Sequence, residues 1–217
     1  MKKTKFAVSI GLILFAVIFT IMVKVIDVKP TGVDNTEIGF STLNHLVFNA
    51  TGVNIVWYYI TDWLGLIPIF MAVIYAIVGV VQLIKRKSFC KVDKEILALG
   101  IFYIILIALY ILFEKVIVNY RPILMDGFLE ASYPSSHTLM AVCICGSSLI
   151  VNNKLYKNKL SKFSNALSVI IIITTILGRL ISGVHWFTDI LGGIIISLAL
   201  LVNFNFAIQK IYNSKNK

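Results

Sequence analysis

Long apolar runs separated by short, lysine-bearing loops limit this chain to one class of fold. Several of these runs reach about 20 residues, the length that an α-helix needs to cross the hydrocarbon core of a bilayer. Of the 217 residues, 59% are hydrophobic and only 14% are charged, and the charges gather between the runs. A soluble domain built around one hydrophobic core does not have this composition. The sequence therefore predicts an integral membrane protein.

The runs predict an all-α fold, a bundle of six transmembrane helices that forms a single domain over residues 1–217. A cleaved signal peptide is the alternative for the first run, because lysines precede it, but its length and the lack of a small-residue cleavage site favour a retained span. We expect Pro68 to bend the second span near its start. A short interfacial helix is expected over residues 37–48, in the first outer loop. The predicted spans are residues 6–25, 64–84, 96–118, 135–151, 166–181 and 186–211.

Basic residues set the orientation that we expect. With six spans, both termini lie on the same side as the second and fourth loops, and these four segments carry 15 of the 20 lysines and arginines. Because loops rich in basic residues stay in the cytoplasm, both termini are predicted to be cytoplasmic. The net charge of +10 therefore reflects membrane topology rather than nucleic-acid binding. The three cysteines show neither disulfide nor metal-ligand spacing, and no metal or cofactor is predicted.

Polar residues gather at the opposite ends of the predicted spans, in three separate stretches. The third span ends at Arg121-Pro122, the fourth begins within residues 133–137, and the fifth and sixth meet within residues 178–189. The predicted topology brings all three stretches to one depth, on the outer side of the membrane. Charged groups beside apolar runs are costly to place, so we interpret the three stretches as parts of one functional site.

The third stretch places Arg179, His185 and Asp189 between two apolar runs. His185 and Asp189 are four residues apart, so on a helix they lie on one face. The carboxylate would fix the tautomer of the imidazole and leave the other ring nitrogen free to attack an electrophile. The guanidinium of Arg179 has the planar geometry that binds phosphate. The alternative for this stretch taken alone is an ion-paired helix end.

The other two stretches supply further groups suited to a phosphate. Ser135 is a natural N-cap, and the unpaired N–H groups of the first helical turn favour an anion. Ser136 adds a second hydroxyl, and His137 in the first turn can protonate a departing oxygen. Arg121 closes the third span and can bind phosphate. Taken singly, these residues also fit a plain helix cap and an interfacial anchor.

Together the three stretches resemble the signature motifs of the type 2 phosphatidic acid phosphatase superfamily, the lipid phosphate phosphatases. The resemblance covers the six-span layout and residues 114–189. It implies that His185 attacks phosphorus to form a phosphohistidine, that Asp189 orients His185, and that His137 protonates the leaving oxygen and then activates water. It also implies that the phosphoryl oxygens are bound, without a metal, by Arg121, Arg179, Ser135 and the amide of Ser136.

Three positions depart from the motifs of that family. Ser136 stands in place of a glycine, and Gly178 in place of the serine that precedes the arginine of the third motif. Glu114 occupies the position of the family's lysine, two helical turns before Arg121, and Lys115 is one place away. We assign both residues to the substrate-binding region. Our hypothesis is that Glu114 braces an arginine of the site; the alternatives are contact with a cationic or hydroxyl-bearing head group, or a weakened site.

The resemblance implies a membrane phosphatase that hydrolyses a lipid phosphate or diphosphate, and the predicted topology puts its site at the extracytoplasmic face. The Ile-, Lys- and Asn-rich composition suggests a bacterial plasma membrane. Undecaprenyl diphosphate is the substrate that it suggests first, with phosphatidylglycerophosphate and phosphatidate as alternatives. A phosphotransferase that passes the phosphoryl group to a lipid hydroxyl is a second class of function. A non-catalytic membrane protein that keeps the fold is a third, although the intact histidines argue against it, because buried polar groups are costly to retain.

Overall fold

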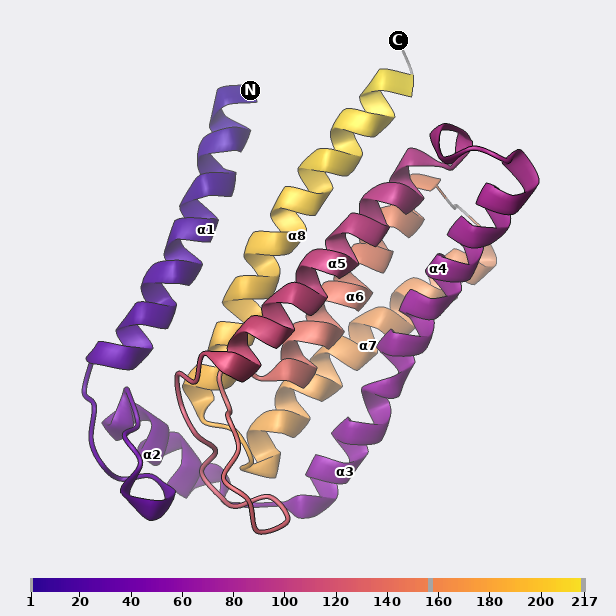
Figure 1. The fold of residues 1–217 in the computed structure, drawn as a ribbon. Helices are drawn as coiled ribbons and strands as arrows, with labels where there is room; N and C mark the ends of the chain where they lie inside the picture. Colours follow the sequence, from indigo (N-terminus) through magenta and orange to yellow (C-terminus); the bar gives the residue numbers. More distant parts are fainter. Residues whose placement is uncertain (1, 156–157, 216–217) are drawn as a thin grey trace.

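The structure, a computed structural model, describes residues 2–155 and 158–215, and α-helices dominate that part of the chain (Figure 1). The helices are α1 (Lys2–Val25), α2 (Ser41–Thr51), α3 (Ile55–Leu64), α4 (Leu66–Arg86), α5 (Lys94–Lys115), α6 (Ser136–Leu155), α7 (Lys159–Ser182) and α8 (Phe187–Lys215). Short 3₁₀ turns lie at Val33–Asn35 and Phe89–Lys91. Isolated β-bridges occur in the loops, at Lys29–Ile38, Tyr120–Ala131 and Met125–Phe128. The prediction of an all-α fold is confirmed.

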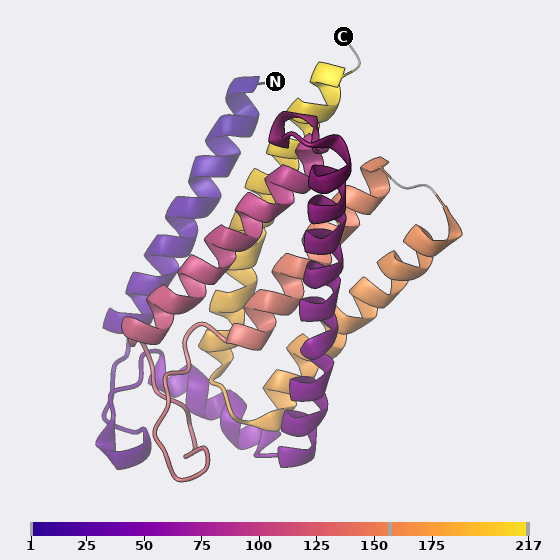
Figure 2. The same cartoon turned by 45° about the vertical axis from the view of Figure 1, so that its right-hand side comes forward.

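Helix α6 lies at the centre of the bundle. It contacts α4, α5, α7 and α8, and residues 141–148 are all buried. Gly146 lies so close to α8 that an added Cβ would stand 2.5 Å from Cδ1 of Leu201. Helix α1 lies at the edge, mainly against α8, and runs beside the other long helices (Figures 1 and 2). Helix α2 lies across one end of the bundle, where the 116–135 loop also lies.

Five stretches in the described part of the chain are helices long and apolar enough to cross a bilayer, and the chain is an integral membrane protein. These stretches are Phe6–Val25, Ile55–Arg86, Lys94–Lys115, Lys159–Ser182 and Phe187–Asn213. Helix α6 is not one of them, so the predicted count of six spans is not matched. The apolar centre of α6 is flanked by polar side chains, with His137 at the start of the helix and Asn152 near its end. Because neighbouring helices surround α6, its sequence does not need a wide lipid-facing apolar surface.

Helices α3 and α4 form one run of 32 residues that is interrupted at Gly65 rather than at Pro68, where we expected the bend. Pro68 has no backbone N–H to bond the carbonyl of Leu64, four residues before it, so the helix loses a hydrogen bond just ahead of the proline. The aromatic residues Trp57, Tyr58, Tyr59 and Trp63 belong to helix α3.

Helix α2 corresponds to the helix expected over residues 37–48, but it begins later, at Ser41, and ends at Thr51. Its Asn44 is fully buried and binds Thr188 of α8 twice. The Asn44 side-chain amide donates to Thr188 Oγ1 at 2.9 Å, and the Thr188 backbone N–H donates to Asn44 Oδ1 at 3.1 Å. These bonds hold α2 against the start of α8, beneath the turn that carries His185.

Helix α3 packs closely on α7 at Gly178. A Cβ added to Gly178 would lie 2.3 Å from Thr61 Cγ2 and 3.0 Å from Trp57 Cε3, both on α3. The absence of a side chain at Gly178 therefore sets how near the two helices approach. Replacing the serine of the family motif by Gly178 therefore does more than remove one hydroxyl, because the glycine lets α3 pack closely on α7.

Gly178→Ala should lower the thermal stability of the protein, because Thr61 is buried and its β-branched side chain has little freedom to move away. We expect the Tm in detergent to fall by about 2–10 °C, the shift that follows from an overpacking cost of about 1–3 kcal/mol. Gly100→Ala on α5 is the control, since nothing lies within 4 Å of a Cβ there, and its Tm should equal or exceed that of the parent. An unchanged Tm for Gly178→Ala would contradict the close packing of α3 on α7.

Candidate active site

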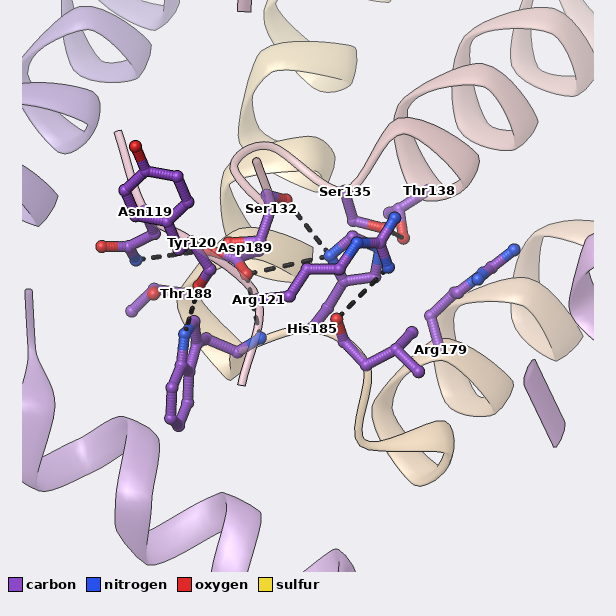
Figure 3. Close-up of polar contacts among 12 residues, drawn as sticks. Asn119, Tyr120, Arg121, Ser132, Ser135, Thr138, Arg179, His185, Thr188 and Asp189 are labelled. Atoms are coloured by element: carbon purple, nitrogen blue, oxygen red, sulfur yellow. Dashed lines mark hydrogen bonds and ion pairs between the residues drawn. The ribbon is translucent and has the colours of Figure 1, made fainter. Parts of the chain in front are cut away.

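Three segments that are far apart in the sequence meet at one end of the bundle, and a cavity of about 500 Å³ opens between them. They are the 116–135 loop, the start of α6 and the turn between α7 and α8 (Figures 1 and 3). Polar groups line the cavity from all three segments and from the end of α5: Glu114, Tyr120, Arg121, Glu130, Ser132, Ser136, His137 and His185. The structure thus brings together the three stretches that the predicted topology placed side by side.

The turn between α7 and α8 carries His185. Gly183 ends α7 in a left-handed conformation with φ of 68°, and a Cβ there would lie 2.3 Å from the carbonyl oxygen of Gly52. Helix α8 begins two residues after His185, so His185 and Asp189 do not share a helix face as we predicted. The reason is that Asp189 caps its own helix: its Oδ2 accepts a hydrogen bond from the Trp186 N–H at 2.9 Å.

The imidazole of His185 is buried and is contacted at both nitrogens (Figure 3). Nδ1 donates to the carbonyl oxygen of Ser132 at 3.1 Å, and Nε2 lies 3.5 Å from Nη1 of Arg121. A carbonyl only accepts and a guanidinium only donates, so both contacts select the tautomer with the proton on Nδ1 and a lone pair on Nε2. Oδ2 of Asp189 is farther from Nδ1, at 3.8 Å. The carbonyl of Ser132 is thus the nearer orienting group.

Asp189 joins the segments that surround this imidazole. Its Oδ1 accepts a hydrogen bond from Asn119 Nδ2 at 3.3 Å, and its backbone carbonyl accepts one from the Ser135 N–H at 3.0 Å. Beside it, Trp186 Nε1 donates to the carbonyl of Tyr120 at 2.8 Å. Through its carboxylate and its backbone carbonyl, the fully buried Asp189 therefore connects the 116–135 loop, the start of α6 and the start of α8.

Burial lowers the pKa of His185 well below its usual value of 6.5, and the positive charges of Arg121 and Arg179 lower this pKa further. The residue lies outside the apolar stretches of α7 and α8. The imidazole is therefore neutral at neutral pH, the state in which Nε2 can act as a nucleophile.

Arg121 lines the cavity beside His185, and its carboxylate partner is Glu130. Arg121 Nε lies 2.9 Å from Glu130 Oε2, and the Arg121 backbone N–H donates to the Glu130 carbonyl at 3.0 Å. The pairing arises because the 116–135 loop folds back on itself, so helical spacing could not reveal it. Our hypothesis gave this bracing role to Glu114, and the structure gives it to Glu130.

Glu114 nevertheless lines the cavity from the last turn of α5, whereas Lys115 does not. Both side chains are exposed. The side chain of Glu114 interacts with Tyr110, one turn earlier on the same helix. In the described part of the chain no arginine pairs with this carboxylate, although it shares the cavity with Arg121. This fits the alternative of contact with a cationic or hydroxyl-bearing head group.

Ser135 and Ser136 differ in what they can contact. Ser135 is fully buried, its Oγ accepts a hydrogen bond from Thr138 Oγ1 at 3.1 Å, and its N–H is bonded to Asp189. It does not line the cavity. Ser136, the first residue of α6, does line it, at the end of the helix whose dipole favours an anion.

His137 lines the same cavity, and its Nε2 lies 3.0 Å from Oδ1 of Asp62 on α3. We did not predict Asp62 as a site residue, because it lies in an apolar run away from the three stretches. A signal was present in the sequence: Asp62 is the only charged residue between Ile55 and Ile84. A lone carboxylate in such a run is a functional candidate because it is costly to place in a membrane.

Arg179 is completely buried and does not line the cavity. Its Nη2 donates to Oδ1 of Asp62 at 3.3 Å, and its guanidinium lies over the ring of Tyr58, 5.1 Å from the centroid. Figure 3 shows Arg179 extending from α7 beside the group formed by Arg121 and His185. Its Nε and Nη1 have no hydrogen-bond partner among the described residues. Buried donors are normally satisfied, so Arg179 keeps the capacity to bind an anion.

Comparison with known proteins agrees with this geometry. Residues 112–212 match the sequence profile of the PAP2 superfamily. In fold, the chain is similar to a transmembrane PAP2-type phosphatidylglycerolphosphate phosphatase from Bacillus subtilis, with a TM-score of 0.59, 18% sequence identity, and coverage of 93% of this chain and 96% of that one. No curated protein matches the chain in sequence. The region that matches the PAP2 superfamily profile contains all three polar stretches, and the similarity in fold extends over nearly the whole chain.

Proposed function

We propose that this protein is a membrane phosphatase that hydrolyses a lipid phosphate or diphosphate through a phosphohistidine on His185. The observation that carries the proposal is that His185 and His137, from separate segments, line one cavity together with Arg121. The tautomer of His185 leaves the Nε2 lone pair beside the Arg121 guanidinium, a cation suited to phosphoryl oxygens. The match of residues 112–212 to the PAP2 superfamily profile supports the same class of reaction.

The reaction has two steps in this proposal. First, the Nε2 lone pair of His185 attacks phosphorus, the bond from phosphorus to the lipid oxygen breaks, and that oxygen keeps the electron pair and receives a proton from His137. Second, water attacks phosphorus, the P–N bond breaks with its electron pair returning to Nε2, and His137 accepts a proton from the water. Arg121 and the N–H of Ser136, which line the cavity, stabilise the phosphoryl oxygens, the buried Arg179 contributes its positive charge from outside the lining, and neither step uses a metal.

We place this site at the extracytoplasmic face of a bacterial plasma membrane. In this topology α6 crosses the membrane as the fourth of six spans, α2 lies at the outer interface, and both termini are cytoplasmic. The concentration of lysines and arginines in the termini and in the second and fourth loops supports the orientation. The chain acts as one domain over residues 1–217.

The cavity favours an amphiphilic substrate. Its polar lining adjoins Phe113, Ile117 and Leu139, from the α5 end and from α6, so a head group in the cavity leaves its chain beside apolar side chains. Undecaprenyl diphosphate is the substrate that we propose. The alternatives are phosphatidate and phosphatidylglycerophosphate, the latter being the substrate in the name of the similar Bacillus subtilis protein.

Release of inorganic phosphate from a panel of these three lipids, by the purified protein with chelator present, tests the proposal. We expect release from at least one lipid, at a rate that the chelator does not change. Transfer of labelled phosphate to a lipid hydroxyl in place of its release would identify a phosphotransferase. Absence of both activities would overturn the proposal and favour a non-catalytic protein.

The pH dependence of kcat/KM should reflect the lowered pKa of His185. An ordinary histidine is half protonated near pH 6.5, whereas the buried His185 stays neutral there and remains a nucleophile. After correction for the second ionisation of the substrate phosphate, we expect the acid limb of kcat/KM to lie well below pH 6.5. An acid limb centred at pH 6.5 or above would contradict a buried, neutral nucleophile.

A further inference from the structure

Asp62 makes two contacts that connect an apolar helix to the site. Its Oδ1 lies 3.0 Å from His137 Nε2 and 3.3 Å from Arg179 Nη2, so one oxygen serves a histidine of α6 and an arginine of α7. The carboxylate is half-exposed, with 47% of its side chain accessible, while Arg179 is completely buried. Asp62 lies on α3, outside the three stretches that suggested the site.

The imidazole of His137 is turned with one edge toward α3. A Cβ added to Gly65 would lie 2.9 Å from Cδ2 of His137 and 3.4 Å from its Nε2, so this edge of the ring rests against the break between α3 and α4. The opposite edge carries Nδ1, which is buried and has no hydrogen-bond partner among the described residues. Because His137 also lines the cavity, Nδ1 is the ring nitrogen that the protein leaves free.

Two glycines allow Asp62 to reach this position. Gly178 on α7 admits Thr61 and Trp57, the neighbours of Asp62 on α3, and Gly65 admits the ring of His137. A side chain at either glycine would push α3 outward and lengthen the contact between Asp62 and His137. The close packing of α3 on the site therefore serves to place a carboxylate there.

We propose that Asp62 is the positioning residue of the general acid, an inference that rests on the proposed phosphatase reaction. Its carboxylate accepts the Nε2–H of His137 and stabilises the imidazolium, so that Nδ1–H delivers its proton to the leaving oxygen. After that transfer, Nδ1 holds the lone pair that accepts a proton from water in the second step. In this proposal each histidine of the site has a carboxylate near it, Asp62 beside His137 and Asp189 beside His185.

The leading test is Asp62→Asn, which keeps the size of the side chain and removes its charge. Loss of a charge-assisted hydrogen bond should lower kcat for the lipid phosphate by about 10- to 100-fold, with KM within about threefold of the parent. Asp62→Glu should recover part of the loss. Asp126→Asn is the matched control, since it removes an exposed carboxylate of the 116–135 loop that does not line the cavity, and it should behave as the parent.

A double-mutant cycle separates positioning of His137 from a structural role. If Asp62 acts through His137, Asp62→Asn should change kcat by less than about threefold once His137 is already Gln. Inhibition by inorganic phosphate reports on the contact between Asp62 and Arg179, because Arg179 is proposed to favour phosphate binding. The inhibition constant for phosphate should be unchanged in Asp62→Asn. The Tm of each variant in detergent shows that the comparison is made on folded protein.

Each result bears on a different claim. A parent that hydrolyses no lipid phosphate overturns the proposed function and this inference with it. An active parent with Asp62→Asn at the parental kcat overturns the inference alone. The inference also fails, and the proposed function stands, if Asp62→Asn lowers kcat equally in the parent and in the His137→Gln background. A weaker inhibition by phosphate with unchanged kcat would instead assign Asp62 to Arg179.

Discussion

His185→Ala should abolish phosphate release from the lipid substrate, with a fall in kcat of about 10⁴-fold or more. The variant removes the nitrogen that we propose becomes bonded to phosphorus, and the other groups that line the cavity offer no second neutral imidazole held between a carbonyl and a guanidinium. The measurement is release of inorganic phosphate under saturating substrate, with the Tm in detergent as a check on folding.

His45→Gln is the matched control, since His45 is the remaining one of the three histidines in the sequence. Its Nε2 lies 2.9 Å from Thr31 Oγ1, a contact that glutamine can keep, and it does not line the cavity. This variant should retain activity within about threefold of the parent. Activity of His185→Ala within tenfold of the parent would contradict the assignment of the nucleophile.

His137→Gln should produce the second-largest loss, a fall of about 10²–10⁴-fold in kcat for a lipid phosphomonoester such as phosphatidate, because the alkoxide of the lipid leaves slowly without a proton donor. An aryl phosphate such as p-nitrophenyl phosphate has a leaving group that does not need the proton. With that substrate the first step should remain fast and only the second step, attack by water, should be slow.

The two substrates should therefore differ in rapid-mixing experiments on His137→Gln. We expect a burst of about one p-nitrophenolate per protein followed by slow turnover, and no burst of alcohol from the lipid phosphate. The parent should show fast turnover of the lipid. An equal loss in the first step for both substrates would contradict a general-acid role for His137 and indicate a general disturbance of the cavity.

The sequence predicted the helices and the meeting of three polar stretches because both depend on patterns that are local or nearly so. Apolar runs mark the helices, and Arg121, His137 and His185 each stand at the end of such a run. Their convergence follows once the helices are packed side by side. The central helix α6 was predicted as a span but is not among the five apolar stretches, since its burial among other helices relaxes the need for apolar residues at its ends.

The contacts that could not be predicted are those between segments whose approach depends on side-chain volume. Glu130 reaches Arg121 because a loop folds back, and Asp62 reaches His137 because Gly178 and Gly65 leave room for α3. Such distances have no signature in residue spacing. The lone charge at Asp62 could have been noticed, but its partner could not have been named.

Asp189 illustrates a third kind of difference. Its spacing from His185 fits one face of a helix, but the helix begins after His185, and the carboxylate caps the Trp186 N–H while lying 3.8 Å from the imidazole. A residue predicted to orient the nucleophile by direct pairing also holds the backbone around it. The spacing of four residues was interpreted as one helix face, and this was wrong because α8 begins only at Phe187.

The most direct measurement of the central claim is the site of the covalent phosphoryl group. His137→Gln, mixed with ³²P-labelled p-nitrophenyl phosphate and quenched in alkali to protect phosphohistidine, should carry about one label per protein, located on His185 by mass spectrometry. The same variant with His185→Ala should carry none. Label on another residue would contradict the account. So would a parent that releases phosphate while neither the parent nor His137→Gln ever carries label.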